Sequence, residues 1–153
     1  MKAKSLLVVL GISVVMLFGF QALGPGRAFS VTATVDIDPD TVNITKEGRW
    51  ITVYVSLPEG YNVSDIDRSE IFLKDAFVPE WSVSQEWSSI ECNKLMVKFD
   101  SQAVIDHLWN RLCHMGLNRA QMTLTLEGQL KDGTSFAGSD TITAMDPGGQ
   151  NCA

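Results

Sequence analysis

The chain has 153 residues, of which 45% are hydrophobic and 20% are charged, a balance typical of globular proteins and not of disordered ones. Residues 1–30 contain three basic residues and no acidic one, so the 9 basic and 18 acidic residues that remain give the rest of the chain a net charge of −9. An acidic surface repels nucleic acids and anionic lipid headgroups. We therefore expect no nucleic-acid partner, and membrane contact only through the N-terminal segment.

The N-terminal segment has the layout of a secretory signal. Two lysines precede the uncharged, apolar run 6–20, and the small residues Ala28 and Ser30 are spaced as in a signal cleavage site. The run is short for a membrane-spanning helix, which favours cleavage before Val31 over an uncleaved signal anchor. Both alternatives predict a secreted or cell-surface protein. The expected parts of the chain are a signal segment at 1–30, one domain at 31–145 and a flexible tail at 146–153.

Alternation of apolar and polar residues predicts β-strands from Val31 onward. The pattern is strict in 31–37 and 50–57, with Trp50 and Tyr54 on the outward face of the second run. Further strands are expected at 69–73 and 94–99, and an Asp-Gly turn at 132–133 between two alternating runs predicts a hairpin. Residues 75–93 have the least regular pattern.

One helix interrupts the strands. Asp100 or Ser101 is a plausible N-cap for a helix that runs to about Cys113, with an apolar stripe for packing on a sheet and with His107 and Arg111 facing water. Six or seven strands with short turns predict a mainly β fold, an immunoglobulin-like antiparallel β-sandwich with one inserted α-helix, preceded by the hydrophobic signal segment.

Four stretches in order resemble a β-sandwich module that recurs in secreted and surface proteins of archaea and bacteria. They are VTATVDIDPDTVN, GRWITVYVSLPEGYNVSDID, LMVKFD and LTLEGQLKDGTSFAGSDTI, and the resemblance covers nearly all of residues 31–145. The resemblance implies a non-catalytic, mostly uncharacterised extracellular module. Members often carry an Asp-rich loop, resembling a calcium loop, before the strand that matches LMVKFD. This chain has no Asp between Ala76 and Phe99, so the resemblance does not carry a calcium site to that position.

A run of three acids is the candidate metal site of the sequence. Asp36, Asp38 and Asp40 are spaced by two, which places them on one face of a strand and offers oxygen ligands to Ca²⁺. The alternative is a solvated strand edge whose charges discourage aggregation. No other cofactor is expected.

The three cysteines all follow the signal segment, so export would let one disulfide form and leave one thiol over. A strand over 93–99 and a helix returning over 101–113 would bring Cys113 level with Cys92. We therefore expect a Cys92–Cys113 bridge, with Cys152 in a mobile tail. Three unpaired thiols are the alternative.

Other surface features point to binding and not to chemistry. Trp81 and Trp87 lie in the irregular segment and are candidates for contact with a glycan or a protein partner, or they cover one end of the sandwich. Asn43 and Asn62 begin N-x-[ST] sequons and are possible glycosylation sites. No catalytic motif is present. We expect a structural or interaction module of the cell exterior, with a calcium- or carbohydrate-binding module as the alternative.

Overall fold

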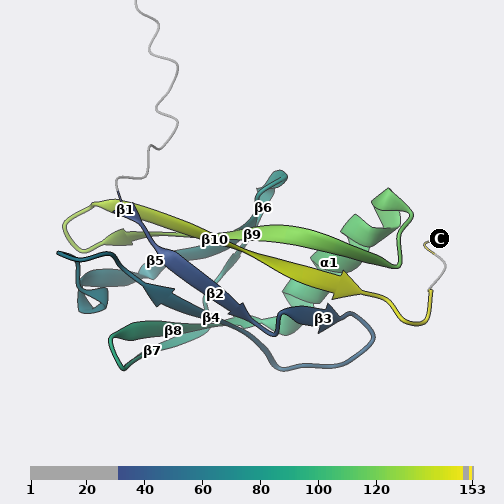
Figure 1. Ribbon diagram of the computed structural model, residues 1–153, viewed down its shortest axis with the longest axis horizontal. Coiled ribbons are helices and arrows are strands. Elements are labelled where there is room, and N and C mark those ends of the chain that lie inside the picture. The colour runs from purple at the N-terminus through teal and green to yellow at the C-terminus, as the bar shows by residue number, and fades with distance from the viewer. Residues whose placement is uncertain (1–30, 150–151, 153) are drawn as a thin grey trace, which may run out of the picture.

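In the computed structural model, residues 31–149 and 152 are described, and they form a β-sandwich of two sheets with one α-helix (Figure 1). This architecture confirms the predicted fold class. The predicted signal segment 1–30 lies outside the described residues. Within the described part of the chain, no helix is both long and apolar enough to cross a membrane.

The strand order is that of an immunoglobulin-like sandwich. Sheet A has the order β1-β10-β9-β5-β6, with β3 also paired to β10, and sheet B has the order β2-β4-β8-β7. The helix occupies the connection between β8 and β9, where an immunoglobulin domain joins its fifth and sixth strands. The strands of sheet A are β1 (Val31–Thr32), β3 (Thr41–Asn43), β5 (Ile66–Asp75), β6 (Val78–Ser84), β9 (Arg119–Leu130) and β10 (Ser135–Met145). Those of sheet B are β2 (Thr34–Asp38), β4 (Trp50–Ser56), β7 (Trp87–Glu91) and β8 (Lys94–Asp100); the helical elements are η1 (Val63–Asp65) and α1 (Ser101–Met115).

The N-terminal strand crosses from one sheet to the other at Ala33. Before the crossing, β1 runs parallel to β10, and the Ala33 amide donates to the Ala137 carbonyl at 2.8 Å; after it, β2 pairs with β4. Gly138 of β10 lies directly against this crossing. A Cβ atom at Gly138 would lie 2.4 Å from the Ala33 carbonyl oxygen, so the close approach of the two strands requires glycine there.

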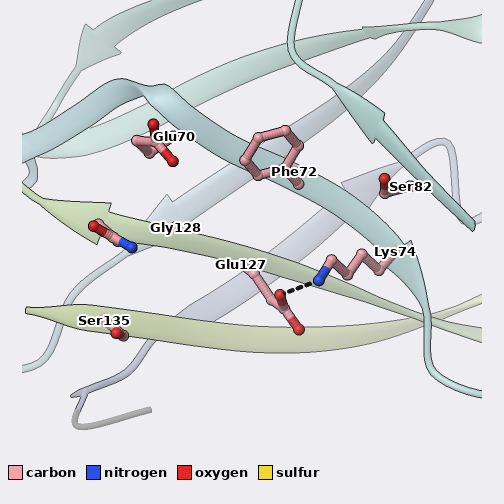
Figure 2. A pocket seen from close by; sticks show the side chains of 8 residues that line it. Glu70, Phe72, Lys74, Ser82, Glu127, Gly128 and Ser135 are labelled. Atoms are coloured by element: carbon pink, nitrogen blue, oxygen red, sulfur yellow. Dashed lines mark ion pairs between the residues drawn. The ribbon is translucent and has the colours of Figure 1, made fainter. Parts of the chain in front are cut away.

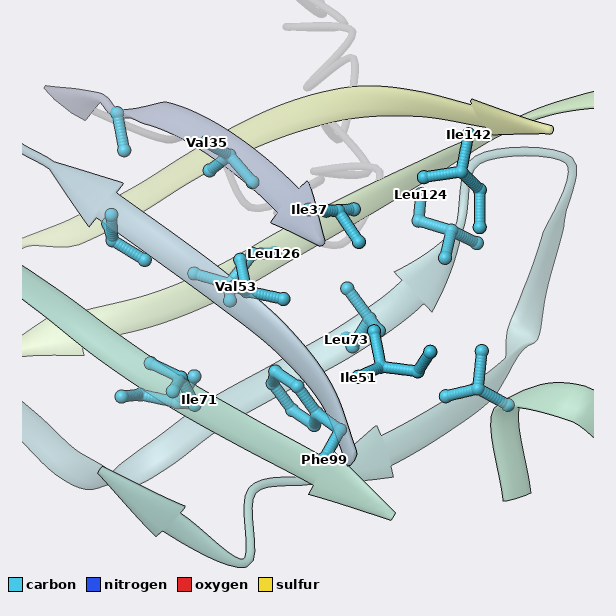
Figure 3. Packing of buried hydrophobic residues seen from close by; sticks show 14 of the residues in the cluster. Val35, Ile37, Ile51, Val53, Ile71, Leu73, Phe99, Leu124, Leu126 and Ile142 are labelled. Carbon is cyan, nitrogen blue, oxygen red and sulfur yellow. The ribbon is translucent and has the colours of Figure 1, made fainter. Parts of the chain in front are cut away.

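The core confirms the alternation of the sequence. The residues predicted to point inward from the first two strands and from the hairpin are buried, except Leu57, which is partly buried against the core. Side chains from both sheets meet in a single cluster (Figure 3). The helix begins at the predicted cap, because the Asp100 side chain accepts a hydrogen bond from the Gln102 amide at 3.1 Å. It ends at Gly116, whose φ of 65° is the left-handed conformation that glycine adopts readily. Its buried apolar side chains are Val104, Ile105, Leu108 and Leu112.

The segment 75–93, which shows little pattern, contains two strands. Strand β6 lies at the edge of sheet A and β7 at the edge of sheet B. Edge strands contact a neighbour on one side only, so their inward positions stay partly exposed and tolerate polar residues. The hairpin between β7 and β8 turns at Cys92 and Asn93, both with positive φ, as a two-residue type I′ hairpin turn requires.

Candidate functional site

A buried polar cluster joins the helix to the β5–β6 hairpin. Asp75, 2% exposed at the end of β5, has its Oδ2 atom 2.8 Å from Nε2 of His107, which is 8% exposed on α1. The Trp81 ring of β6 stacks on the imidazole, with centroids 4.0 Å apart and planes 12° from parallel. The Nε atom of Arg111 lies 3.5 Å from the same carboxylate oxygen, and the Phe77 amide donates to the other oxygen at 2.7 Å. The prediction that His107 faces water is therefore wrong.

The reason for this error is tertiary. His107 and Arg111 lie beside the apolar stripe of α1, and only the end of β5 supplies the anion that allows both to turn inward. Asp75 follows Ile71 and Leu73 at an inward position of the same strand. A charged residue in the alternating pattern of core residues is the sequence feature that indicates a buried polar contact here. The Asp75 carboxylate on one edge of the His107 ring and the Trp81 ring over its plane join α1 to the β5–β6 hairpin.

The two tryptophans predicted as one contact surface lie in different sheets. Trp81 belongs to β6 of sheet A and packs partly against the core. Trp87 belongs to β7 of sheet B and is 47% exposed, with the Lys98 ammonium 5.1 Å from its ring centroid. The two residues therefore do not share one sheet face, and their binding role stays a prediction. Trp87 is the more exposed of the two, because Trp81 is partly buried with its ring against His107.

Trp87 forms part of a half-exposed outer face on sheet B, which we call the B face. The register aligns the outward residues of neighbouring strands in rows. One row contains Asp36, Tyr54 and Met96, and the next contains Asp38, Thr52, Lys98 and Trp87. Trp50 is outward at the end of β4, opposite Asp100. The B face therefore has two aspartates on edge strand β2, and apolar and aromatic side chains in the middle. Lys98 lies beside Trp87 on the opposite side of the face. The B face also includes Trp50 and Tyr54, the two aromatic residues of β4 that were predicted to point outward.

The acidic run is only partly brought together. Carboxylate oxygens of Asp36, Asp40 and Asp140 lie within 4.8 Å of one another, and Asp38 does not belong to this group. Asp140 comes from an inward position of β10, and its two oxygens accept hydrogen bonds from the Ile37 and Thr141 amides, both at 2.8 Å. The sequence run thus supplies two of three grouped carboxylates, and the third comes from a strand a hundred residues later. Oxygen donors of this kind suit Ca²⁺.

The disulfide joins Cys113 to Cys152, with 5.4 Å between the Cα atoms. The predicted Cys92–Cys113 bridge is wrong, because Cys92 lies exposed in the β7–β8 turn with a free thiol. The prediction assumed that α1 returns along β8, whereas the C-terminal segment reaches the helix end. The Asp146 amide donates to the Asn118 carbonyl at 2.8 Å, which places the start of the predicted tail beside the residues that follow α1.

Both sequons adopt the same local turn. The Thr45 hydroxyl and amide donate to Oδ1 of Asn43, and the Ser64 hydroxyl and amide donate to Oδ1 of Asn62. Asn62 is exposed at the N-cap of η1, and Asn43 is half-buried at the end of β3. Glycosylation of either residue remains a prediction.

A shallow hollow of about 340 Å³ lies on the outer face of sheet A (Figure 2). Phe72 and Lys74 of β5 line it, and Lys74 pairs with Glu127 of β9 at 2.6 Å. The ammonium of Lys74 and the carboxylate of Glu127 are therefore paired with each other inside the hollow. The hollow therefore offers less free polar surface than its residue types suggest. Its other lining residues are Glu70, Ser82, Gly128, Gln129 and Ser135.

Comparisons with known proteins include a distant structural likeness. No protein-family model matches the chain, and no curated protein is similar to it in sequence. Among solved structures, the N-terminal domain of the Streptococcus gordonii adhesin Sgo0707 has a TM-score of 0.25 and 10% sequence identity, over 78% of this chain. The match spans 33% of that adhesin chain. A similarity of this size carries no conclusion about function.

Proposed function

We propose that this chain is a non-catalytic module of the cell exterior that binds another protein through the B face. The observation that carries the proposal is the group of aromatic and apolar side chains that shares the B face with Trp87. Trp87 is 47% exposed on an edge strand, and Tyr54, Met96 and Trp50 share its face at half-buried positions. Aromatic residues and Met are enriched where proteins bind one another.

The contacts of the buried cluster support a structural role for Asp75 and His107. These two form the only carboxylate–imidazole pair among the described residues. In catalytic triads the imidazole contacts a nucleophile on one side and a carboxylate on the other. Here the His107 ring has the Asp75 carboxylate on one edge and the Trp81 ring over its plane. Both contacts hold α1 against the β5–β6 hairpin.

The disulfide supports an extracellular location. Disulfides persist in oxidising compartments and are rare in the cytosol, and the Cys113–Cys152 bridge belongs to the folded part of the chain. The charged and apolar pattern of residues 1–30 is that of an export signal. A secreted or surface-tethered protein is consistent with both observations.

Labelling of Cys92 on intact cells tests the location. The Cys92 thiol is free and exposed at a hairpin turn, so a membrane-impermeant maleimide will reach it if the domain lies outside the cell. We expect equal labelling of the full chain before and after cell lysis, and a Cys92→Ser variant serves as the blank. Labelling that appears only after lysis would place the domain inside and refute the proposal.

Cross-linking on intact cells tests binding through the B face. An impermeant amine-reactive cross-linker is expected to give one defined larger species with the wild-type chain, because Lys94 and Lys98 lie on the B face. Tyr54→Ser combined with Trp87→Ser should abolish that species. Glu70→Ser, an exposed change on sheet A, should leave it intact. If the wild type gives no larger species, or if the B-face changes have no effect, the proposed binding role is wrong.

A calcium-binding role is the second candidate, and the grouping of Asp36, Asp40 and Asp140 favours it. An ion bound only to the folded state raises its melting temperature by mass action. We expect a higher melting temperature at about 1 mM Ca²⁺, the range of extracellular calcium modules, than in EDTA. Asp36→Asn and Asp40→Asn should remove the increase, and Asp38→Asn, outside the group, should retain it. An unchanged melting temperature would exclude this candidate.

A further inference from the structure

We propose that the partner of the B face is a second copy of this chain, related by a two-fold axis that runs along β4. This inference rests on the proposed function, because it identifies the protein that the B face binds. Its basis is the placement of opposite charges on either side of β4.

Asp38 and Lys98 are equivalent positions on the two neighbours of β4. Asp38 of β2 pairs with Thr52 of β4, and Thr52 pairs with Lys98 of β8. Neighbouring strands are about 4.8 Å apart, so the two charges lie at nearly equal distances on opposite sides of β4. Asp36 and Met96 flank Tyr54 in the same way in the next row.

Among the described residues, neither Asp38 nor Lys98 forms an ion pair within its own chain. The ion pairs of the described residues involve Lys74 with Glu127, and His107 and Arg111 with Asp75, and neither Asp38 nor Lys98 takes part. Lys98 contacts the Trp87 ring, and both residues lie in the same outward row of sheet B. Asp38 and Lys98 are too far apart on the B face to pair with each other. When the B face of a second copy packs against the first, Asp38 of each copy can pair with Lys98 of the other.

A half-turn about an axis parallel to β4, between the two copies, places the complementary positions opposite each other. It places β2 of one copy opposite β8 of the other, so Asp38 faces Lys98 of the second copy and the reverse pair forms at the same time. Tyr54 of each copy then meets its own counterpart on the axis. Two packed sheets lie about 10 Å apart with nearly aligned strands, a gap that a lysine and an aspartate side chain can bridge together.

The net charge of −9 in residues 31–153 opposes self-association in general. Local pairing at Asp38 and Lys98 must therefore outweigh a diffuse repulsion. Salt weakens both effects, so ionic strength is a poor test. Reversal of single charges is a better one, because it changes the local pairs while it alters the net charge by a known amount.

Sedimentation of the full chain, purified after export, tests the inference. We expect a dimer for the wild type and monomers for Asp38→Lys alone and for Lys98→Asp alone, since each variant creates two like-charged pairs and weakens association by roughly tenfold or more. A mixture of the two single variants should form a heterodimer, because each supplies the charge that the other lacks. The double variant Asp38→Lys with Lys98→Asp should recover the homodimer.

Matched changes outside the B face control for net charge. Glu70→Lys on the outer face of sheet A changes the charge by the same amount as Asp38→Lys, and it should leave the dimer intact. A wild-type chain that stays monomeric at about 1 mM, where even weak complexes form, would overturn the inference, as would a dimer that tolerates both single reversals. In that case the size of the cross-linked species on cells decides whether the B face binds a different protein. A species larger or smaller than a dimer would keep the proposed binding role with a different protein.

Discussion

Trp81 and His107 stack with their ring centroids 4.0 Å apart, although one residue lies on an edge strand and the other on the helix. Asp75 is 2% exposed, and its carboxylate contacts both the His107 ring edge and the Arg111 guanidinium. One buried carboxylate therefore holds two cationic or polar groups of α1 against the β5–β6 hairpin. The position of the helix depends on this contact as well as on its apolar stripe.

Removal of the buried carboxylate should be strongly destabilising. Asp75→Ala leaves His107 and Arg111 without their anion, and loss of one partner of a buried ion pair costs about 3–5 kcal/mol. Glu80→Ala, an exposed change on the same hairpin, should change the free energy of unfolding by less than about 0.5 kcal/mol. Urea unfolding of both variants measures the difference. Equal stabilities would mean that the cluster contributes nothing to the fold.

Gly138 should tolerate no side chain. A Cβ atom there would lie 2.4 Å from the Ala33 carbonyl oxygen and 2.6 Å from a methyl carbon of Val35. We expect Gly138→Ala to lower the free energy of unfolding by about 1–3 kcal/mol, the usual cost of overpacking. Gly48→Ala is the matched control, because a Cβ atom at Gly48 meets nothing within 4 Å. Denaturant midpoints report both, and a stable Gly138→Ala variant would show that the crossing at Ala33 can move.

The disulfide should contribute to stability, and the free thiol should not. Cys152→Ser opens a covalent link between residues 39 apart, and we expect a loss of about 2–4 kcal/mol. Cys92→Ser changes an exposed side chain in a hairpin turn and should have little effect. Peptide mapping without reduction checks the pairing directly. A fragment that joins Cys92 to either other cysteine would contradict the Cys113–Cys152 bridge.

Two surface aspartates, half-exposed Asp67 and exposed Asp132, should make stability fall in acid. The hydroxyl and amide of Ser69 donate to Asp67, and the Thr134 amide donates to Asp132, so these hydrogen bonds hold the pKa of each carboxyl below its ordinary value. Because the folded pKa is lower than the unfolded one, the contribution is complete above the unfolded value of about 3.9 and is lost as the pH falls through the folded pKa. Asp67→Asn with Asp132→Asn should flatten the fall of the melting temperature below pH 4. An acid profile identical to that of the wild type would contradict this assignment, and Glu59→Gln serves as the control.

Local patterns in the sequence determined most of the secondary structure. Alternation predicted the inward residues of β2, β4 and β10, since each faces a single dry interior and the side-chain period of a strand is two. The start and end of α1 followed from Asp100 and Gly116, because capping depends on residues close in the chain. The outward position of Trp50 and Tyr54 followed from the same alternation. Edge strands β6 and β7 carried a weaker pattern and were missed.

Relations between distant segments were decided only by the tertiary structure. The anion beside His107 comes from β5, the third carboxylate near Asp36 comes from β10, and the cysteine bonded to Cys113 comes from the end of the chain. Each contact joins residues at least 32 apart in sequence. Periodicity reports which side of an element is buried, but the neighbour on that side depends on how sheets and helix pack, and that arrangement leaves no local pattern.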